Sequence, residues 1–580
     1  MRAATGWVGS IGVMGALALG ACTRAKETPP PMQRLLPGLG VVTMERLSGQ
    51  TRPAAVLAPG EVRRCPVQLA RGSRLVYAAG ILNPPRAGRV HVTVTVGGKQ
   101  VDELTIDLAR RRRWWRRAVE LQGAGESEIS FRGEWVGNSA HAPAESKDGW
   151  SLAIGSPRIY RGGKPGRVLV WISQDALRAD HLGLYGYQRP TSPRIQARAR
   201  DWVVFDKAMS TCSWTLPSMT SQFTGELPSR HGVILHTLQL SESTPTVFQA
   251  LASDGFTVVG VTANDLISPA SGLARGFDVL FYLDARAEEL NHRLDVGLSE
   301  WGGGDLALFI HYMDPHAPYV PPESFGRRFD ARWDEGPLGT SFEMLNRITA
   351  PGQVKRVVDL YDAEIAYADH SIGDLLAHLA ERGLLDRAVI AYSADHGEEF
   401  QDHGRWQHGS TLYQEVLHVP LALRVPGFPA RRIETPVSML ELGPTLLDAL
   451  NVARPVGMDV QGLMPWIRGE GPPGEPLFAE TALTRDHRPL AAVRDGDLKY
   501  IAKLAPGDDL HPSVATAHLY DLARDPHEHE DLRAQRRDTA RLEQVLLDSL
   551  ARNRARASAS VPAVLDDSTV DKLRELGYVQ

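Results

Sequence analysis

The sequence predicts an α/β protein: a mostly parallel sheet covered by helices, an N-terminal β-sandwich, and a smaller C-terminal α+β part. Three observations predict this class. Continuous apolar runs such as "RVLVWIS" at 167–173 are typical of strands buried on both faces. Helix-like segments alternate with these runs, which is the order expected of a parallel sheet. Short strands of alternating polarity occupy the region before residue 164, as in a sandwich.

Length and composition set the broad limits. The 580 residues exceed a single compact core, so several domains are expected. The 43% hydrophobic and 23% charged residues are ordinary for a globular protein. The formal net charge of -5 is weak for this length and does not indicate a nucleic-acid partner.

The first segment, residues 1–22, is predicted to be a signal peptide. Arg2 precedes the apolar run "WVGSIGVMGALALG", which is shorter than the ~20 residues that a membrane span needs. The run ends in Leu19-Gly20-Ala21-Cys22, which resembles a bacterial lipobox whose Cys22 becomes lipidated. A plain secretory signal is the alternative. We therefore expect an exported lipoprotein, tethered by its N-terminal lipid in the cell envelope, at the outer membrane or in the periplasm.

Residues 23–50 are predicted to be a flexible linker, because 23–38 is polar and rich in proline. Residues 51–163 are predicted to form a β-sandwich resembling a jelly roll, with a hairpin turning at Gly97-Gly98. Within it, "RRRRWWRRAVEL" at 110–121 has two interpretations. It is either a patch that binds anions or glycans, or an edge strand with solvated arginines and one buried tryptophan.

Residues 164–474 are predicted to form the main domain. Its further strands are "FTVVGVTA", "LALFIHYMD" and "AVIAYSAD", at 256–263, 306–314 and 388–395. A helix is expected over 244–255, with Thr244 as N-cap and Gly255 at its end, and a longer one over 361–383. Residues 475–580 are predicted to form the C-terminal α+β part, with a hairpin at 491–504 and a final helix.

Reactive side chains follow several predicted strands, where ligands bind in open α/β sheets. Asp175, Asp314-Pro315-His316 and Asp395-His396 all stand at such ends. Each carboxylate alone is most simply a helix N-cap, and so is Thr215 in "TCSWTLPSM". A helix N-terminus also stabilises a deprotonated hydroxyl, and a divalent ion bound beside it would make Thr215 a competent nucleophile.

Five ordered motifs resemble the sulfatase family of the alkaline phosphatase superfamily. They are "ISQDALRADHLGLYGY", "TLPSMTSQFTGELPSRHGV", "HYMDPHAPYVPP", "SADHGEEFQDHGRWQHGSTLYQEVLHVPLALRVPG" and the terminal pair "LYDLARDPHEHEDL" and "LRELGYVQ". The resemblance runs from about Val168 to the C-terminus. It implies a metal-dependent ester hydrolase on an alkaline-phosphatase-like sheet.

The resemblance also implies roles for individual residues. Asp175, Asp395 and His396 would hold one divalent ion with Thr215, and calcium, manganese, magnesium or zinc would suit this set. His316 would contact the transferred group. His408, at a position where many sulfatases have lysine, would contact the same group or protonate the leaving group. A second metal site formed by Asp314, His316 and His408 is the alternative.

The departures from the family pattern concern the nucleophile. Sulfatases present Cys or Ser in C/S-x-P-S-R, which is oxidised to formylglycine, whereas this chain has Thr215 and, at the arginine position, Met219. The extra methyl group of threonine prevents oxidation to an aldehyde. Sulfatases also often show two adjacent Asp residues at the first strand, whereas here Asp175 is flanked by Gln174 and Ala176. We therefore expect phosphoester chemistry to be favoured over sulfate chemistry.

The expected substrates are a sulfated or phosphorylated glycan, lipid or small-molecule ester. Two other functions stay open: a transferase of phosphoethanolamine or phosphoglycerol to envelope glycans, and a non-catalytic glycan-binding lipoprotein. Pairing of Cys65 with Cys212 also stays open.

Overall fold

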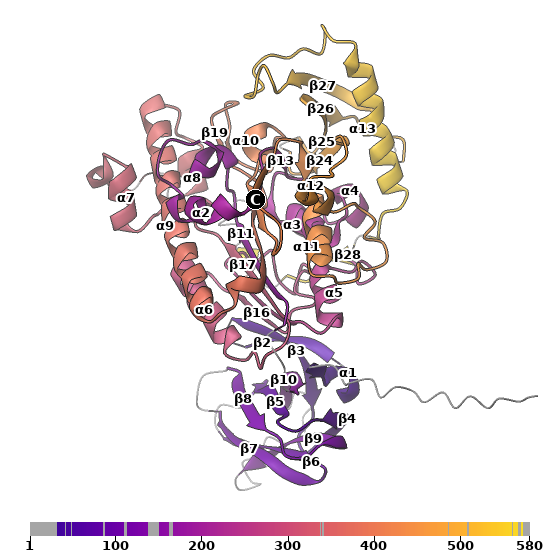
Figure 1. Ribbon diagram of the computed structural model, residues 1–580. Helices are drawn as coiled ribbons and strands as arrows, with labels where there is room; N and C mark the ends of the chain where they lie inside the picture. The colour runs from indigo at the N-terminus through magenta and orange to yellow at the C-terminus, as the bar shows by residue number, and fades with distance from the viewer. Residues whose placement is uncertain are drawn as a thin grey trace, which may run out of the picture.

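The computed structural model describes residues 32–571 except 41, 48, 85–87, 109–112, 137–149, 162–165, 337, 339–340, 485, 507–509, 560 and 566–569. The predicted signal peptide, with Cys22, and the first part of the predicted linker lie outside the described residues. The chain forms an α/β body with a β-sandwich at one end and a C-terminal sheet and helix at the other (Figure 1).

One long sheet forms the centre of the molecule. Its parallel strands lie in the order β18, β11, β17, β15, β16, and β21 continues the sheet antiparallel beside β18. These strands are β11 (Val168–Gln174), β15 (Thr257–Thr262), β16 (Val279–Tyr282), β17 (Leu306–Tyr312), β18 (Ala388–Ala394) and β21 (Leu421–Arg424). Every residue of β11, β15, β17 and β18 is buried, as their apolar runs predict. The predicted mostly parallel sheet is confirmed.

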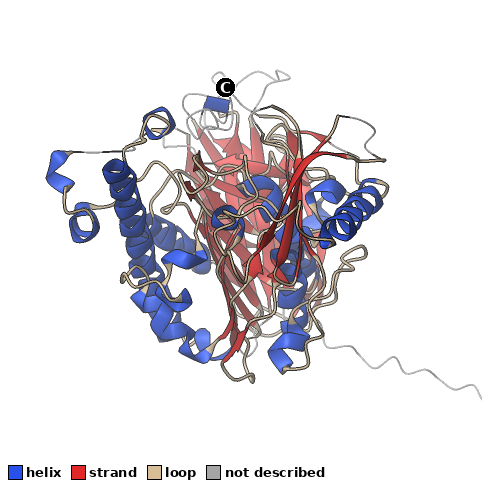
Figure 2. Cartoon of the chain, turned by 90° about the horizontal axis from the view of Figure 1, so that it is seen from above, coloured by secondary structure: helices blue, strands red, loops and turns tan. Residues whose placement is uncertain are grey.

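Helices cover both faces of this sheet (Figure 2). One group packs together around the long helix α9, and the other packs around the helix that begins at Thr215. The first group is α2 (Pro193–Arg198), α6 (Ala287–Leu298) and α9 (Pro351–Glu381), and the second is α3 (Thr215–Thr224), α5 (Val247–Ser253) and α11 (Leu442–Ala449). The central sheet is thereby buried between two helical layers.

Helix α5 begins two residues later than the sequence predicts. Its N-cap is Thr246, not Thr244. Thr246 Oγ1 accepts from the backbone N–H of Gln249 (3.2 Å), while Gln249 Oε1 accepts from the N–H of Thr246 (3.1 Å). This capping box satisfies two N–H groups at once, so it stabilises the later start over an N-cap at Thr244.

The N-terminal region is a two-layered β-sandwich. One layer, β4 (Val62–Leu69), β9 (Gly125–Val136), β6 (Arg89–Val96) and β7 (Lys99–Asp107), contains the predicted hairpin at Gly97-Gly98. The other layer is β3 (Gln50–Leu57), β10 (Ser151–Tyr160), β5 (Arg74–Leu82) and β8 (Trp115–Glu120). β3 pairs antiparallel with β16, Thr51 opposite Leu280, so this layer continues the central sheet across the predicted boundary at 163.

Residues 32–47 differ from the predicted flexible linker. They form β1 (Met32–Arg34), α1 (Leu36–Leu39) and β2 (Val42–Leu47), and β2 pairs with β3. The physical reason is apolar burial, because Leu35, Leu39 and Leu47 are at most 6% exposed against the sandwich strands.

The C-terminal part is a four-stranded antiparallel sheet packed against one helix. Its elements are β24 (Leu477–Thr481), β25 (Leu490–Asp495), β26 (Leu498–Leu504), β27 (Val514–Asp521) and α13 (Asp538–Arg554). The predicted hairpin is β25–β26, and Leu542, Leu546 and Leu550 of α13 pack onto it. Cys65 and Cys212 are both buried and free, and within the described ranges each helix is too short or too polar to cross a membrane.

Candidate active site

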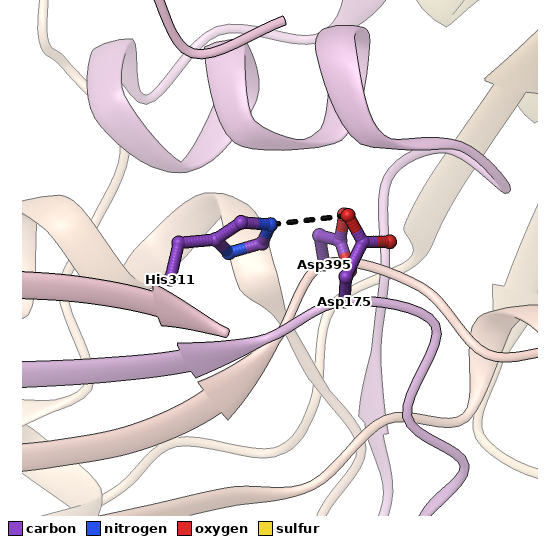
Figure 3. A group of neighbouring side chains, drawn as sticks. All are labelled: Asp175, His311 and Asp395. Atoms are coloured by element: carbon purple, nitrogen blue, oxygen red, sulfur yellow. Dashed lines mark hydrogen bonds and ion pairs between the residues drawn. The ribbon is translucent and has the colours of Figure 1, made fainter. Parts of the chain in front are cut away.

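The site lies where three central strands end together. In the parallel register Gln174 of β11 lies opposite Tyr312 of β17 and Ala394 of β18. Asp175 and Asp395 each follow these residues directly, so their carboxylates emerge at the same edge of the sheet, as Figure 3 shows. Both side chains are fully buried. This edge is the usual ligand position in an α/β sheet.

Thr215 faces these carboxylates instead of capping its helix. It is the first residue of α3, the N-cap position is occupied by Trp214, and α3 has no side-chain cap. Thr215 Oγ1 lies 3.4 Å from both carboxylate oxygens of Asp175 and 3.3 Å from His396 Nε2. Of the two readings of this threonine, the geometry matches a hydroxyl directed into a polar site at a helix N-terminus.

His396 and Asp395 complete the polar group around this hydroxyl. His396 Nδ1 donates to the carbonyl of Gly397 (2.8 Å), which leaves Nε2 facing Asp175 and Asp395, 3.4 Å from an oxygen of each. Asp395 Oδ1 accepts from the N–H groups of His396 (2.9 Å) and Ala176 (3.2 Å). Its other oxygen, Oδ2, is buried and has no hydrogen-bond partner among the described residues.

These donors fit a divalent ion. The unpartnered Oδ2 of Asp395, the carboxylate of Asp175 and Nε2 of His396 converge with the Thr215 hydroxyl, and oxygen and imidazole ligands suit calcium, magnesium, manganese or zinc. The carbonyl of Gly397 fixes the His396 tautomer, which is the usual outer support of a ligating histidine. The predicted set Asp175, Thr215, Asp395 and His396 is therefore brought together in one place.

The pKa directions agree with a site that is short of positive charge. Burial works to raise the pKa of Asp175, but His316, His311 and His396 outweigh it and lower that pKa. Burial, reinforced by the charge of Asp175, raises the pKa of Asp395 well above its usual value. Two adjacent buried carboxylates cannot both ionise cheaply unless a cation lies between them.

Two further residues of the site were missed by sequence reasoning. Asn264 Nδ2 donates to Asp175 Oδ2 (2.6 Å) and lies 3.4 Å from Thr215 Oγ1. His311 Nε2 lies 3.2 Å from the same Asp175 oxygen, and with Asp175 and Asp395 it forms a group able to hold a metal ion. Asn264 follows β15 almost directly, so the strand-end rule applied to "FTVVGVTAND" would have found it. His311 is inside β17, where a buried histidine in an apolar strand was the available signal.

His316 and His408 lie together beside the metal-binding group. Their ring centres are 4.9 Å apart, and the ring of His408 is 4.3 Å from that of His396. His408 Nδ1 donates to Glu398 Oε1 (3.0 Å), and Tyr319 Oη donates to the other oxygen of Glu398 (2.8 Å). Burial lowers the pKa of His408 to about 4, so its ring is neutral at pH 7.

Asp314 is separated from these two histidines. Its Oδ1 accepts from the backbone N–H of Ala287 at the start of α6 (3.3 Å). Burial raises the pKa of Asp314 to about 7. The structure therefore brings together His316 and His408 of the alternative second metal set, while Asp314 turns toward α6.

A second acidic group lies nearby but is explained without an ion. His403 Nδ1 donates to Glu415 Oε1 (2.6 Å), and Nε2 lies 3.2 Å from the carbonyl of Glu528. Burial works to lower the pKa of His403, but Glu415 outweighs it and raises that pKa to about 9. His403 is therefore a cation at pH 7 with both N–H groups used.

The fold and the site define a class: an α/β protein with a buried threonine hydroxyl beside carboxylate and imidazole groups at the carboxyl edge of its sheet. Comparison with known proteins finds a family resemblance. Residues 167–452, just under half of the chain, match the family model "Sulfatase". This part of the chain is therefore similar to the sulfatase family.

Individual relatives agree with this resemblance. A choline-sulfatase from Rhizobium meliloti is 30% identical over 239 residues, which are 38% of this chain and 44% of that protein, so the chain spans under half of this relative. The phosphonate monoester hydrolase of Agrobacterium radiobacter has 20% identity and a TM-score of 0.54, covering 69% of this chain and 100% of that one. A structure determined with its substrate D-glucosamine-2-N,6-O-disulfate has 16% identity and a TM-score of 0.55, covering 68% and 98%. The two structures show the shared fold.

Proposed function

We propose that the protein hydrolyses phosphate- or sulfate-type esters, with phosphoesters favoured, through a covalent ester on Thr215. One observation carries the proposal. The Thr215 hydroxyl is fully buried at the first residue of α3 and lies within 3.4 Å of Asp175 and His396 instead of capping the helix. A hydroxyl in this position is arranged to attack.

The residues of the chain then have distinct tasks. Thr215 Oγ1 attacks phosphorus, the bond to the leaving alcohol breaks, and water later cleaves the Thr215 ester. Asn264 holds Asp175 in place by its 2.6 Å hydrogen bond. His316 and His408 lie on the side where the non-bridging oxygens and the leaving group would stand, and Glu398 fixes the ring of His408. A bound divalent ion would supply charge neutralisation and a lower pKa for the Thr215 hydroxyl.

The preference for phosphorus follows from the nucleophile. A Thr215–sulfate ester would be slow to resolve, because threonine lacks the second hydroxyl through which a formylglycine hydrate expels sulfate. Met219, at the arginine position of the sulfatase motif, is fully buried in the apolar core. It supplies no positive charge for a sulfate or phosphate oxygen.

The test compares esters that share one leaving group. Purified protein loaded with each candidate metal is assayed on p-nitrophenyl sulfate, p-nitrophenyl phosphate and bis-p-nitrophenyl phosphate. We expect phosphoester turnover to exceed sulfate turnover, Thr215→Ala to be inactive, and Thr215→Ser to keep measurable activity. Thr220→Ala is the matched control, because Thr220 Oγ1 donates to the Leu216 carbonyl on the same helix (2.6 Å). Strong sulfatase activity without phosphoesterase activity, or an active Thr215→Ala, would refute the proposal.

The metal content and the cellular location belong to the same proposal. We favour one ion at Asp175, Thr215, Asp395 and His396, which metal analysis of the purified protein checks. Two tightly bound ions, one of them lost in His408→Ala, would contradict this metal count.

We also propose an exported lipoprotein anchored through Cys22. Cys22→Ser should release the protein into a soluble exported fraction, and its retention in the membrane would exclude the lipid anchor.

The proposed substrates are anionic esters of a glycan, a lipid or a small molecule. The names of the relatives support this range, since one is a choline-sulfatase and another was solved with a disulfated glucosamine.

A further inference from the structure

A cleft of about 830 Å³ lies between strand β8 of the sandwich and helix α6 of the sulfatase-like domain. Gln50, Trp114 and Arg116 line it from the sandwich, and Phe281, Arg293 and Ser299 line it from the neighbouring domain. In Figure 1 α6 lies above β8, and Arg116 of β8 reaches the Val296 carbonyl of α6. The volume is within the roughly 300–1,000 Å³ of small-molecule sites. This cleft is away from Thr215, because the site lies where β11 and β18 end.

The cleft contains part of the arginine-rich segment 110–117. β8 is the last strand of its sheet, and Trp114 is 5% exposed and donates through Nε1 to the carbonyl of Gln50 (3.1 Å). The edge-strand interpretation therefore accounts for Trp114 and the strand. It does not account for the concentration of guanidinium groups at a wall of the cleft.

Two arginines face the cleft from opposite sides. Arg116 Nη1 donates to the Val296 carbonyl (2.9 Å) and lies 3.3 Å from Ser299 Oγ, so its guanidinium is held over the C-terminal end of α6. Arg293 pairs with Glu289 on the same helix (2.6 Å), and its buried Nε has no acceptor among the described residues. Each side chain is 39% exposed, so both are fixed and still reachable.

Arg116 and Glu300 of the cleft belong to an ion-pair set that holds more guanidinium groups than carboxylates. Four guanidinium groups surround two carboxylates in a connected set of ion pairs: Arg34, Arg52, Arg116, Arg158, Asp278 and Glu300. Glu300 lines the cleft and contacts three of these arginines.

Arg158 shows the shortage of acceptors most clearly. It is 1% exposed, and none of its three nitrogens has a hydrogen-bond acceptor in the described part of the chain. The nearest ion-pair oxygens, on Asp278 and Glu300, are 3.5 and 3.7 Å away. A buried charge without full compensation is costly, so this ion-pair set is short of negative charge.

We propose that this cleft binds the sulfate or phosphate group of an anionic oligosaccharide, as a binding site separate from the active site. Guanidinium groups match the oxygens of such groups, and the partly exposed Trp115 provides apolar surface for a sugar ring. A saccharide is favoured over a bilayer because Arg116 and Arg293 face each other across a concave cleft, whereas a membrane is contacted by outward-facing side chains. The choice of a sulfated or phosphorylated glycan rests on the proposed function.

The test uses the full chain carrying Thr215→Ala, which cannot consume the ligand. The probe is a heparin-derived hexasaccharide, titrated by calorimetry at low and at physiological salt. We expect Arg293→Ala in this background to weaken binding about tenfold, and Arg116→Lys, which keeps the charge but loses the fork, to weaken it less. Arg347→Ala is the matched control, since this arginine is 76% exposed, pairs with Glu343 four residues earlier and does not line the cleft. The variant carrying Thr215→Ala and Arg347→Ala should bind the hexasaccharide with the same affinity as Thr215→Ala alone.

Each alternative has its own outcome. Equal affinities of Arg293→Ala and Arg347→Ala would overturn the proposal, as would binding that is lost only in His316→Ala. Binding to phosphatidylglycerol vesicles that depends on Arg293, without binding of the hexasaccharide, would replace the saccharide by a membrane. Turnover of bis-p-nitrophenyl phosphate by the wild-type chain is measured separately. If the wild-type chain shows no turnover but the hexasaccharide binds in a manner that depends on Arg293, the proposed function is rejected and the proposed cleft site is retained.

Discussion

Asn264 offers a sharp test of the proposed active site, because it contacts both Thr215 and Asp175. In Asn264→Ala the 2.6 Å hydrogen bond to Asp175 Oδ2 and the 3.4 Å contact with Thr215 are lost. A hydrogen bond to a charged group contributes about 1.5–3 kcal/mol, and about 1.4 kcal/mol corresponds to a factor of ten. If the whole contribution is felt in the transition state, kcat/KM should fall roughly 10- to 150-fold.

The fold should survive this change. Asp175 Oδ2 keeps His311 Nε2 at 3.2 Å, and the loss at the turn is one hydrogen bond, which the Leu266 N–H donates to Asn264 Oδ1 (2.9 Å). The assay is kcat/KM on bis-p-nitrophenyl phosphate, with thermal unfolding as a check. Thr262→Val is the control, because it removes the hydrogen bond to the Asn264 backbone N–H (3.0 Å) and leaves the Asn264 side chain. A kcat/KM of Asn264→Ala within twofold of wild type would refute the assigned role of Asn264.

Three further predictions concern stability. The pKa of His403 is raised to about 9 from 6.5, so its contribution to stability is complete below about pH 6.5 and is lost as the pH rises through 9. Urea midpoints measured between pH 6 and 10 should show this loss. The same pH profile in His403→Gln as in the wild type would contradict the assignment to His403. Arg52→Ala should lower the free energy of unfolding by about 3–5 kcal/mol, because Glu300 loses the arginine that donates two hydrogen bonds to it. The double variant Arg52→Met with Glu300→Leu should recover most of that loss in denaturant titrations. Metal removal by a chelator should lower the unfolding temperature, because Asp175 and Asp395 then repel each other, and equal melting curves would argue against an ion between them.

The sequence was informative where one local pattern decides the structure. Runs of buried apolar residues located β11, β15, β17 and β18, and Gly97-Gly98 located the hairpin of the sandwich. The side chains directly after β11 and β18, Asp175, Asp395 and His396, could be proposed for the same reason, because parallel strands end at one edge. These predictions needed only the strand, its direction and the next residue.

Other features depend on contacts between distant segments. The orientation of the Thr215 hydroxyl is set by Asp175 and His396, so "TLPS" alone could not distinguish a cap from a nucleophile. Asp314 follows a strand as Asp175 does, yet it turns to Ala287 of α6, a partner that strand position cannot reveal. The start of α5 could have been predicted from the sequence, because Gln249 lies three residues after Thr246 and completes the capping box.

The pairing of β3 with β16 has a consequence for how the chain folds. β16 lies within residues 167–452, which match the sulfatase family model, and β3 of the sandwich pairs with its outer edge through residues more than two hundred positions earlier in the sequence. A truncated protein beginning after residue 163 would expose the open edge of β16, which is a template for aggregation. The sandwich therefore covers the edge of the central sheet. We expect the sandwich and the domain that contains β16 to unfold in one cooperative transition rather than separately.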